Sequence, residues 1–270
     1  MKVYISCDME GISGVVNWEQ TSKQGGDEYQ RARLLMTLEV NAAVEGAFAA
    51  GASEVLVNDS HGGMRNILIE HFHQEAKLIS GSPKLMSMME GIDSSYDAAM
   101  FIGYHARMGA RGILSHTYTG TISEYRVNGK LMGETGMNAA VAGCFGVPVV
   151  MVAGDSAVTQ EAAHLLGDIK TVAVKETLTR YAAKCLHPEK AREMIKQTAI
   201  EALRQRANVT PLVVSRPVTV SVKFVDSGYA DGAEVLPHSK REDDLTLSYT
   251  DDSYLNCLRA ARAMMSLAGR

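Results

Sequence analysis

The sequence has few of the features that mark secreted, membrane or nucleic-acid-binding proteins. Its four cysteines are widely spaced and none forms a C-x-x-C pair, so we expect reduced thiols of a cytosolic protein rather than a disulfide framework. No apolar run is long enough to span a membrane, and no basic region followed by a long apolar stretch predicts a signal peptide. The net charge is −4 with no block of like charges, which argues against binding to nucleic acid or to an anionic membrane.

What remains is the composition of a folded, soluble protein. Apolar residues make up 46% of the 270 residues and charged residues 21%, which is enough for one large domain or two modest ones with a sizeable core. The 15 methionines fall mostly in apolar segments, where we expect them to fill that core.

The N-terminal opening is the most informative stretch. Residues 2–5 are rich in β-branched and aromatic side chains and predict a strand, whereas the glycines of residues 11–14 predict a turn. Asp8 and Glu10 therefore lie where a strand ends, and residues two apart in an extended chain point to the same side. Two close carboxylates repel each other, and a divalent cation would resolve that conflict. The alternative is that Asp8 caps a turn and Glu10 is solvated.

Strand and helix patterns alternate through the first part of the chain. The expected helices cover residues 29–50, 85–90, 137–144 and 156–167, and the expected strands cover 54–59, 76–79, 97–103, 148–152 and 171–174. Short connections between strand, helix and strand predict parallel pairing. Residues 122–132 predict a hairpin with Asn128-Gly129 in its tight turn.

The pattern changes near residue 175. A long amphipathic helix over 188–206 is followed by half-exposed strands over 213–225 and 245–249, and by a terminal helix from residue 252. We therefore predict an α/β fold, with a mostly parallel sheet flanked by helices and a smaller α+β C-terminal domain. The predicted boundaries are 1–174 for the first, α/β domain and 175–270 for the C-terminal α+β domain.

Acidic and imidazole side chains recur at the carboxyl ends of the expected strands. Asp8 and Glu10 end the first strand, His61 follows the second and His105 follows a third. Sites in open parallel sheets are built at this edge, so these residues can converge, and Glu134 between the hairpin and a helix could join them. Mixed oxygen and nitrogen ligands suit zinc or another first-row divalent ion, and five such ligands are enough for two ions.

Each of these residues also has an ordinary structural explanation. His61 could be a turn residue, His105 a hydrogen-bonded core residue, and Glu134 a helix-start carboxylate. Only their joint placement favours a metal centre. His116 lies in a loop between the third strand and the hairpin, where an imidazole could exchange protons or stabilise an anionic intermediate.

These motifs resemble the zinc-dependent D-aminopeptidase family associated with bacterial dipeptide-transport operons. The opening Ser6-x-Asp8-x-Glu10-Gly11 matches the signature of that family. Four further segments follow in the family's order: Asn58 to Gly62, Gly103 to His105, the His116 segment, and Asn128 to Glu134. The resemblance runs the full length of the chain and is densest over residues 1–155.

The resemblance implies a two-zinc site and an activity. It makes Asp8, Glu10, His61, His105 and Glu134 the metal ligands and His116 the catalytic histidine. It further implies release of an N-terminal residue, typically a D-amino acid such as D-alanine, from short peptides. A homo-oligomer, namely a decamer that encloses its active sites, is a known architecture of the family. We therefore expect residues 1–174 to form the metal-binding catalytic domain and residues 175–270 to serve oligomerisation and line the site.

We therefore expect a cytoplasmic, zinc-dependent aminopeptidase in which a carboxylate, Asp8 or Glu10, bridges two ions that activate water. One alternative is another dinuclear metallohydrolase, an amidase or a phosphoesterase, for which Arg65 and Arg107 could grip a phosphate. The other is a non-catalytic metal-binding oligomer. Asp155, also at a strand end, could support the ligands in any of these cases.

Overall fold

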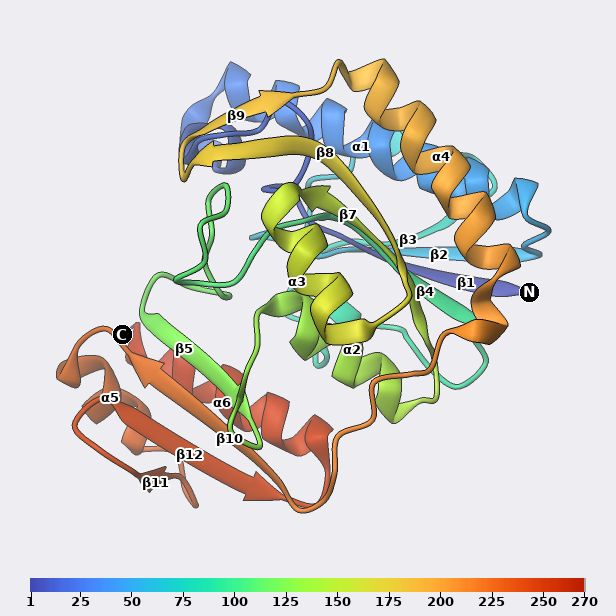
Figure 1. The fold of residues 1–270 in the computed structure, drawn as a ribbon. Coiled ribbons are helices and arrows are strands. Elements are labelled where there is room, and N and C mark those ends of the chain that lie inside the picture. Colours follow the sequence, from blue (N-terminus) through green and yellow to red (C-terminus); the bar gives the residue numbers. More distant parts are fainter. Residues whose placement is uncertain (270) are drawn as a thin grey trace.

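The computed structural model describes residues 1–269 and contains two β-sheets with helices packed around them (Figure 1). The larger sheet has seven strands in the order β3-β2-β1-β4-β7-β8-β9. They are β1 (Lys2–Cys7), β2 (Glu54–Asp59), β3 (Lys77–Ile79), β4 (Ala98–Tyr104), β7 (Val149–Asp155), β8 (Lys170–Thr179) and β9 (Ala182–Cys185). Neighbouring strands pair in parallel, except that β9 pairs antiparallel with β8.

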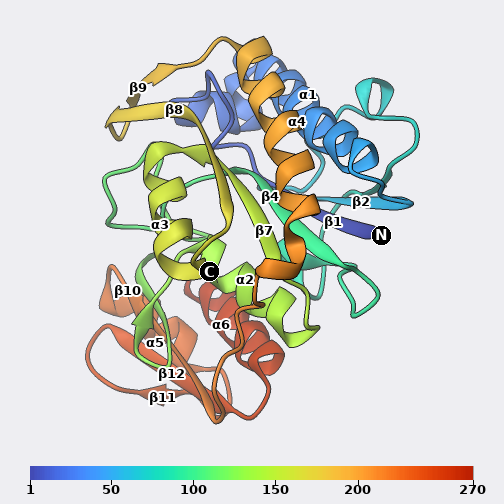
Figure 2. The same cartoon turned by 45° about the vertical axis from the view of Figure 1, so that its right-hand side comes forward.

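Helices cover both faces of the larger sheet, as a parallel sheet requires. Helices α1 (Asp27–Ala49) and α4 (Pro188–Arg204) lie side by side over one face, as Figures 1 and 2 show. Helices α2 (Glu134–Cys144) and α3 (Ser156–Leu166) belong to the core of the other face. The strand period explains this division, because Val3 and Ile5 of β1 pack on the α1 side while Tyr4 between them packs on the α2 side.

The smaller sheet is antiparallel, with five strands in the order β11-β12-β10-β5-β6. They are β5 (Ile122–Val127), β6 (Lys130–Leu131), β10 (Val218–Phe224), β11 (Lys240–Arg241) and β12 (Thr246–Asp251), and helices α5 (Ser227–Glu234) and α6 (Tyr254–Ala268) belong to the same part of the fold. Burial alternates along β10, as predicted for a half-exposed strand. The Tyr254 hydroxyl of α6 donates to the Met137 carbonyl of α2 at 3.0 Å, which links the smaller sheet to the core of the larger one.

The predicted fold class is confirmed, since a mostly parallel sheet flanked by helices is joined to a smaller antiparallel α+β part. The boundary between residues 174 and 175 falls inside β8, and β5 pairs with the C-terminal strand β10. The division into 1–174 and 175–270 therefore stays a prediction about folding units.

Several elements differ in extent or type from the sequence-based expectation. The helix expected from Met137 begins at Glu134, because Gly136 allows its first turn to pack closely on Met132 and Leu165. The strand expected from Val213 begins at Val218, since Pro217 has no N–H to donate to a ladder. The helix signal over 85–90 corresponds to a short 3₁₀ turn, η4 (Ser87–Met89).

Within residues 1–269, we find no helix that combines the length and the hydropathy needed to cross a bilayer.

Candidate metal centre

Three neighbouring strands deliver the first four candidate residues to one edge of the larger sheet. β1 lies between β2 and β4 and pairs in parallel with both. The loops after these three strands therefore begin side by side, and they carry Asp8 with Glu10, His61 and His105 respectively. Glu134 reaches the same edge as the first residue of α2.

Two glycines let the loops after β1 and β4 approach closely. The Gly11 amide donates to the Gly103 carbonyl at 2.7 Å, and Gly103 has φ +72°, which favours glycine. A Cβ on Gly11 would collide with the Tyr104 carbonyl oxygen, and one on Gly103 with the Asp8 carbonyl oxygen. Glycine at these two positions brings the Asp8 loop against the His105 loop.

Asp8 lies between two imidazoles. Its Oδ1 is 3.2 Å from His61 Nδ1, and its Oδ2 is 3.4 Å from His105 Nε2. Glu10 Oε2 is 2.9 Å from the same nitrogen of His61, and Glu134 Oε1 is 3.5 Å from the same nitrogen of His105. The five residues thus form two groups that share the Asp8 carboxylate.

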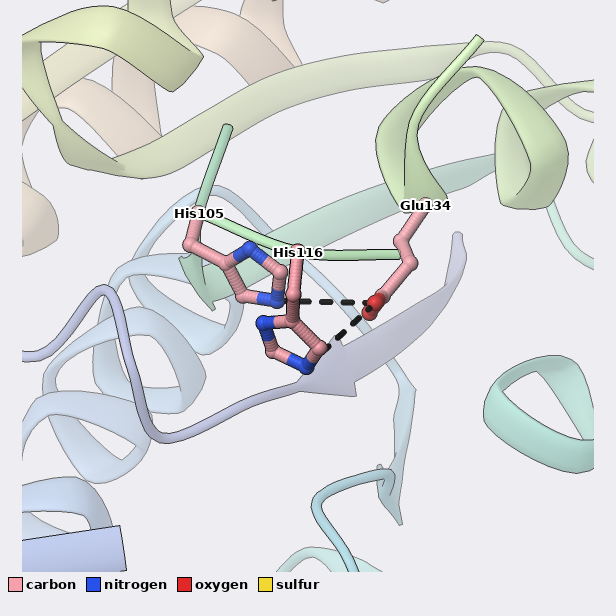
Figure 3. A group of neighbouring side chains, drawn as sticks. All are labelled: His105, His116 and Glu134. Carbon is pink, nitrogen blue, oxygen red and sulfur yellow. Dashed lines mark ion pairs between the residues drawn. The ribbon is translucent and has the colours of Figure 1, made fainter. Parts of the chain in front are cut away.

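His116 lies against the second group (Figure 3). Its ring stacks on the His105 ring with centroids 4.1 Å apart and planes 9° apart, and its Nε2 is 3.9 Å from Glu134 Oε1. The possible ligand atoms of His116, His105 and Glu134 lie close enough together to hold one ion, and so do those of Asp8, Glu10 and His105. All six residues predicted from the sequence therefore converge at one edge.

Each histidine has one ring nitrogen committed to a backbone carbonyl. His61 Nε2 donates to the Thr21 carbonyl at 2.7 Å, His105 Nδ1 to that of Ala106 at 3.0 Å, and His116 Nδ1 to that of Leu114 at 2.9 Å. In a neutral imidazole, the other nitrogen then presents a lone pair. These remaining nitrogens are the ones that face the carboxylates, so lone pairs face lone pairs unless a proton or a cation lies between them.

Burial makes this arrangement costly without a cation. Asp8, Glu10 and Glu134 are only 3%, 2% and 4% exposed, and Glu10 Oε2 and His105 Nε2 make no hydrogen bond. Burial opposes charge on these groups, but contacts with His105 and His61 hold the pKa of Asp8 well below its usual value. In the same way burial disfavours the protonated imidazoles, yet the carboxylates Glu10 and Asp8 raise the pKa of His61, and Glu134 and Asp8 raise that of His105. A buried set of oxygen and nitrogen donors with unpaired atoms fits a zinc-type cation.

Comparison with known proteins agrees with this geometry. The family profile described as D-aminopeptidase matches residues 1–263. The chain belongs to the D-aminopeptidase family. A D-aminopeptidase of Bacillus subtilis (strain 168) is 40% identical over 271 residues, covering 100% of this chain and 98% of that protein. A solved structure, described as Zn-dependent D-aminopeptidase DppA from Bacillus subtilis, a self-compartmentalizing protease, has a TM-score of 0.98 and 39% identity, covering 100% of this chain and 98% of the other.

In this member of the D-aminopeptidase family, a buried lysine that sequence reasoning does not identify organises the loop that carries Asp8 and Glu10. Lys175 of β8 is 1% exposed, and its Nζ donates to the carbonyls of Glu10, Ile12 and Val15. Burial lowers the pKa of Lys175 to about 8, although the nearby Asp155 carboxylate acts in the opposite direction. Its only signal in the sequence is a charged residue directly after the apolar run 172–174.

Asp155 supports the His116 loop rather than His61 or His105. Its Oδ2 accepts from the Ile113 amide at 2.6 Å, and its Oδ1 accepts from the Val158 amide at 2.8 Å as the N-cap of α3. The carboxylate therefore ties the loop that precedes His116 to the end of β7.

Trp18 lies beside the candidate centre and contacts His116. Its ring meets the His116 ring edge to face at 5.3 Å, and the 3₁₀ turn that carries it, η1 (Trp18–Thr21), supplies the carbonyl that holds His61.

The two arginines considered as phosphate ligands, Arg65 and Arg107, have other surroundings. Arg65 is exposed, and the Arg107 side chain donates to the Met108 carbonyl of its own loop.

Proposed function

We propose that this chain is a zinc-dependent aminopeptidase that releases N-terminal D-amino acids, such as D-alanine, from short peptides. Membership of the D-aminopeptidase family supports the reaction, and the Bacillus subtilis relative described as Zn-dependent supports the metal. The observation that carries the proposal is the position of Asp8, with one carboxylate oxygen directed at each of two imidazoles.

The proposed centre holds two zinc ions. Glu10 and His61 would hold one ion and His105 and Glu134 the other, with Asp8 as the shared carboxylate, because each of its oxygens faces a different group. Bound zinc supplies Lewis acidity, which polarises a carbonyl group and makes water more acidic. Carbonyl contacts on the far ring nitrogens keep His61 and His105 oriented for this role.

His116 is the proposed proton carrier. Its Nδ1–H is held by the Leu114 carbonyl, so its neutral form presents an unprotonated Nε2 toward Glu134 and the centre. That nitrogen takes a proton from the attacking water and returns it to the amine that leaves. The Trp18 ring and the His105 ring fix the imidazole from two sides.

The proposed assembly is a cytoplasmic homo-oligomer, with a decamer as the specific expectation. Its support is the Bacillus subtilis structure described as self-compartmentalizing, which shares the whole length of this chain. Sedimentation or light scattering of the purified protein measures the number of subunits.

Elemental analysis combined with a substrate panel tests this function. We expect about two zinc ions per chain and release of D-alanine from D-Ala-D-Ala, with little turnover of simple amides or phosphoesters. Glu10→Ala should lower the bound zinc, and full occupancy in that variant would remove Glu10 from the ligand set. Preferred turnover of a phosphoester would favour a phosphoesterase, and bound metal without any hydrolysis would favour the non-catalytic alternative.

A further inference from the structure

A cavity of about 410 Å³ adjoins the metal centre on the side of the smaller sheet. Its wall includes Gly62, directly after His61, and Tyr118, whose amide donates to Glu134 Oε1 at 2.7 Å. Both residues are therefore attached to the metal centre itself. The volume lies in the range of small-ligand sites, about 300–1,000 Å³.

The cavity wall contains a fixed cation, Arg262 of α6. Its Nη1 donates to the carbonyls of Lys84 and Leu85 at 3.0 and 2.9 Å, which holds the guanidinium in place. Among residues 1–269, no carboxylate forms an ion pair with it. A guanidinium has five N–H donors in a planar fork that matches a carboxylate, so Arg262 keeps donors for a ligand.

The second cation in the wall is already used inside the protein. Lys84 Nζ donates to Asn58 Oδ1 at 2.6 Å and to the Asp59 carbonyl at 2.7 Å, below the end of β2. The remaining donors of the wall are hydroxyls, including those of Ser87, Thr119 and Ser266. Arg262 is thus the charged group best placed to receive an anion.

Tyr118 gives an independent sign of a constrained wall. It has φ +58°, a conformation that costs energy for a bulky side chain, and its buried hydroxyl makes no hydrogen bond. Strained backbone and unsatisfied polar atoms concentrate at ligand sites, where a bound group completes the contacts.

We propose that this cavity is the subsite for the C-terminal part of the peptide and that Arg262 binds its free carboxylate. This inference rests on the proposed aminopeptidase function. With the reacting amide at the metal centre, the leaving part of a short peptide extends past Gly62 and Tyr118 toward α6. The site then selects peptides by length, because only a short peptide places its carboxylate on Arg262.

Two dipeptides that differ only at the C-terminus test the proposal. D-Ala-D-Ala ends in a carboxylate, whereas the second compound, D-Ala-D-Ala amide, ends in an uncharged carboxamide. We expect Arg262→Gln to lower kcat/KM for D-Ala-D-Ala by about 10- to 100-fold, mainly through KM, because a charge-assisted bond is lost. Turnover of the amide should change less than about threefold, since it never makes that bond. Arg262→Lys keeps the charge but not the planar fork of donors. Its kcat/KM for D-Ala-D-Ala should therefore lie between the values of the native protein and of Arg262→Gln.

The matched control is Arg259→Gln, which removes an exposed arginine from the same helix and should leave both substrates unaffected. Equal losses on the acid and the amide would mean that Arg262 only supports the fold through Lys84 and Leu85. A native protein that prefers the amide, or shows no preference, would also overturn the subsite.

The failure of the proposed function has a different signature. If the native protein cleaves neither dipeptide, the aminopeptidase function is wrong, and calorimetric binding of the same two dipeptides decides the subsite. If the native protein binds the acid more tightly than the amide, and Arg262→Gln abolishes that difference, the carboxylate site is supported. Equal binding of acid and amide would reject it.

Discussion

Two of the loops that carry the proposed centre are held by buried charges of opposite sign. The loop after β1 carries Asp8 and Glu10, and the ammonium of Lys175 binds its carbonyls. The loop after β4 carries His116, and the carboxylate of Asp155 binds the amide of Ile113 within it. In both cases irregular backbone beside the site is satisfied by a side chain from another strand of the larger sheet, β8 for the first loop and β7 for the second.

The two loops differ in the side chains that they contribute to the proposed centre. The first loop supplies two proposed metal ligands, whereas the second supplies one, His105, at its start and the proposed proton carrier His116 further on. Asp155 binds the part of the second loop that leads to His116, so damage to the two anchors should have different signatures. Loss of the first anchor should show first in zinc content, and loss of the second should show first in turnover.

The largest effect is expected for His116→Ala. Proton transfer by a positioned side chain contributes about 10²–10⁴-fold to rate, so kcat should fall by that range while zinc content stays at the native value. Steady-state kinetics and elemental analysis on the same sample measure both. A variant that loses zinc would make His116 a ligand, as its distance to Glu134 allows, and unchanged kcat would remove it from the mechanism.

Lys175→Met should have the next largest effect. It leaves the carbonyls of the first loop without donors in a buried place, at a cost of about 3 kcal/mol in the free energy of unfolding. Because these carbonyls position Asp8 and Glu10, zinc affinity should fall about 10- to 100-fold. Chemical denaturation and zinc titration against a chelator measure the two quantities.

Lys184→Met, on the exposed strand β9, is the matched control for Lys175→Met. It should change neither quantity by more than about 0.5 kcal/mol. Native zinc affinity in Lys175→Met would mean that the ligand loop keeps its shape without this anchor.

Asp155→Asn should cost less and act on the other loop. The amide group directs donors at the Ile113 or Val158 amide, which also donate, so about 1–3 kcal/mol of stability should be lost. Turnover should fall with displacement of His116, while zinc content stays near the native value. If Asp155→Asn lost zinc as readily as Lys175→Met, the two loops would not be separable.

The sequence predicts the convergence of the six site residues better than it predicts their support. Asp8, His61 and His105 were located because each follows a buried strand, and parallel strands present those ends together. Lys175 gives no such signal, since its acceptors are carbonyls about 160 positions away, and carbonyls occur at every residue. Trp18 is missed for a similar reason, because its contact with His116 exists only after two distant loops meet.

The same limit applies to the fold. Local patterns locate most elements, including β2 with its exact ends, because burial periodicity is a property of neighbouring residues. The pairing of β5 with β10 joins segments about 95 positions apart, and no local pattern specifies it. The division of the chain near residue 175 follows the change in sequence character, whereas the strands pair across it.

The smallest effect on zinc content and turnover is expected from a second anchor of the first loop, Glu39 of α1. It accepts from the Ser13 amide at 2.9 Å, and burial raises its pKa to about 7 despite that bond and the charges of Lys175 and Arg192. Because the folded pKa exceeds the unfolded value of about 4.3, the folded state holds more protons between these values, and stability falls as the pH rises from about 4 to 7. Glu39→Gln removes this term, so its free energy of unfolding relative to the native protein should rise across that range, by at most about 1.4 kcal/mol per pH unit, and level off above pH 7. Denaturation at a series of pH values measures the slope. Parallel curves for the two proteins would show that Glu39 does not titrate in this window, and would leave Lys175 as the only charge-dependent anchor of the ligand loop.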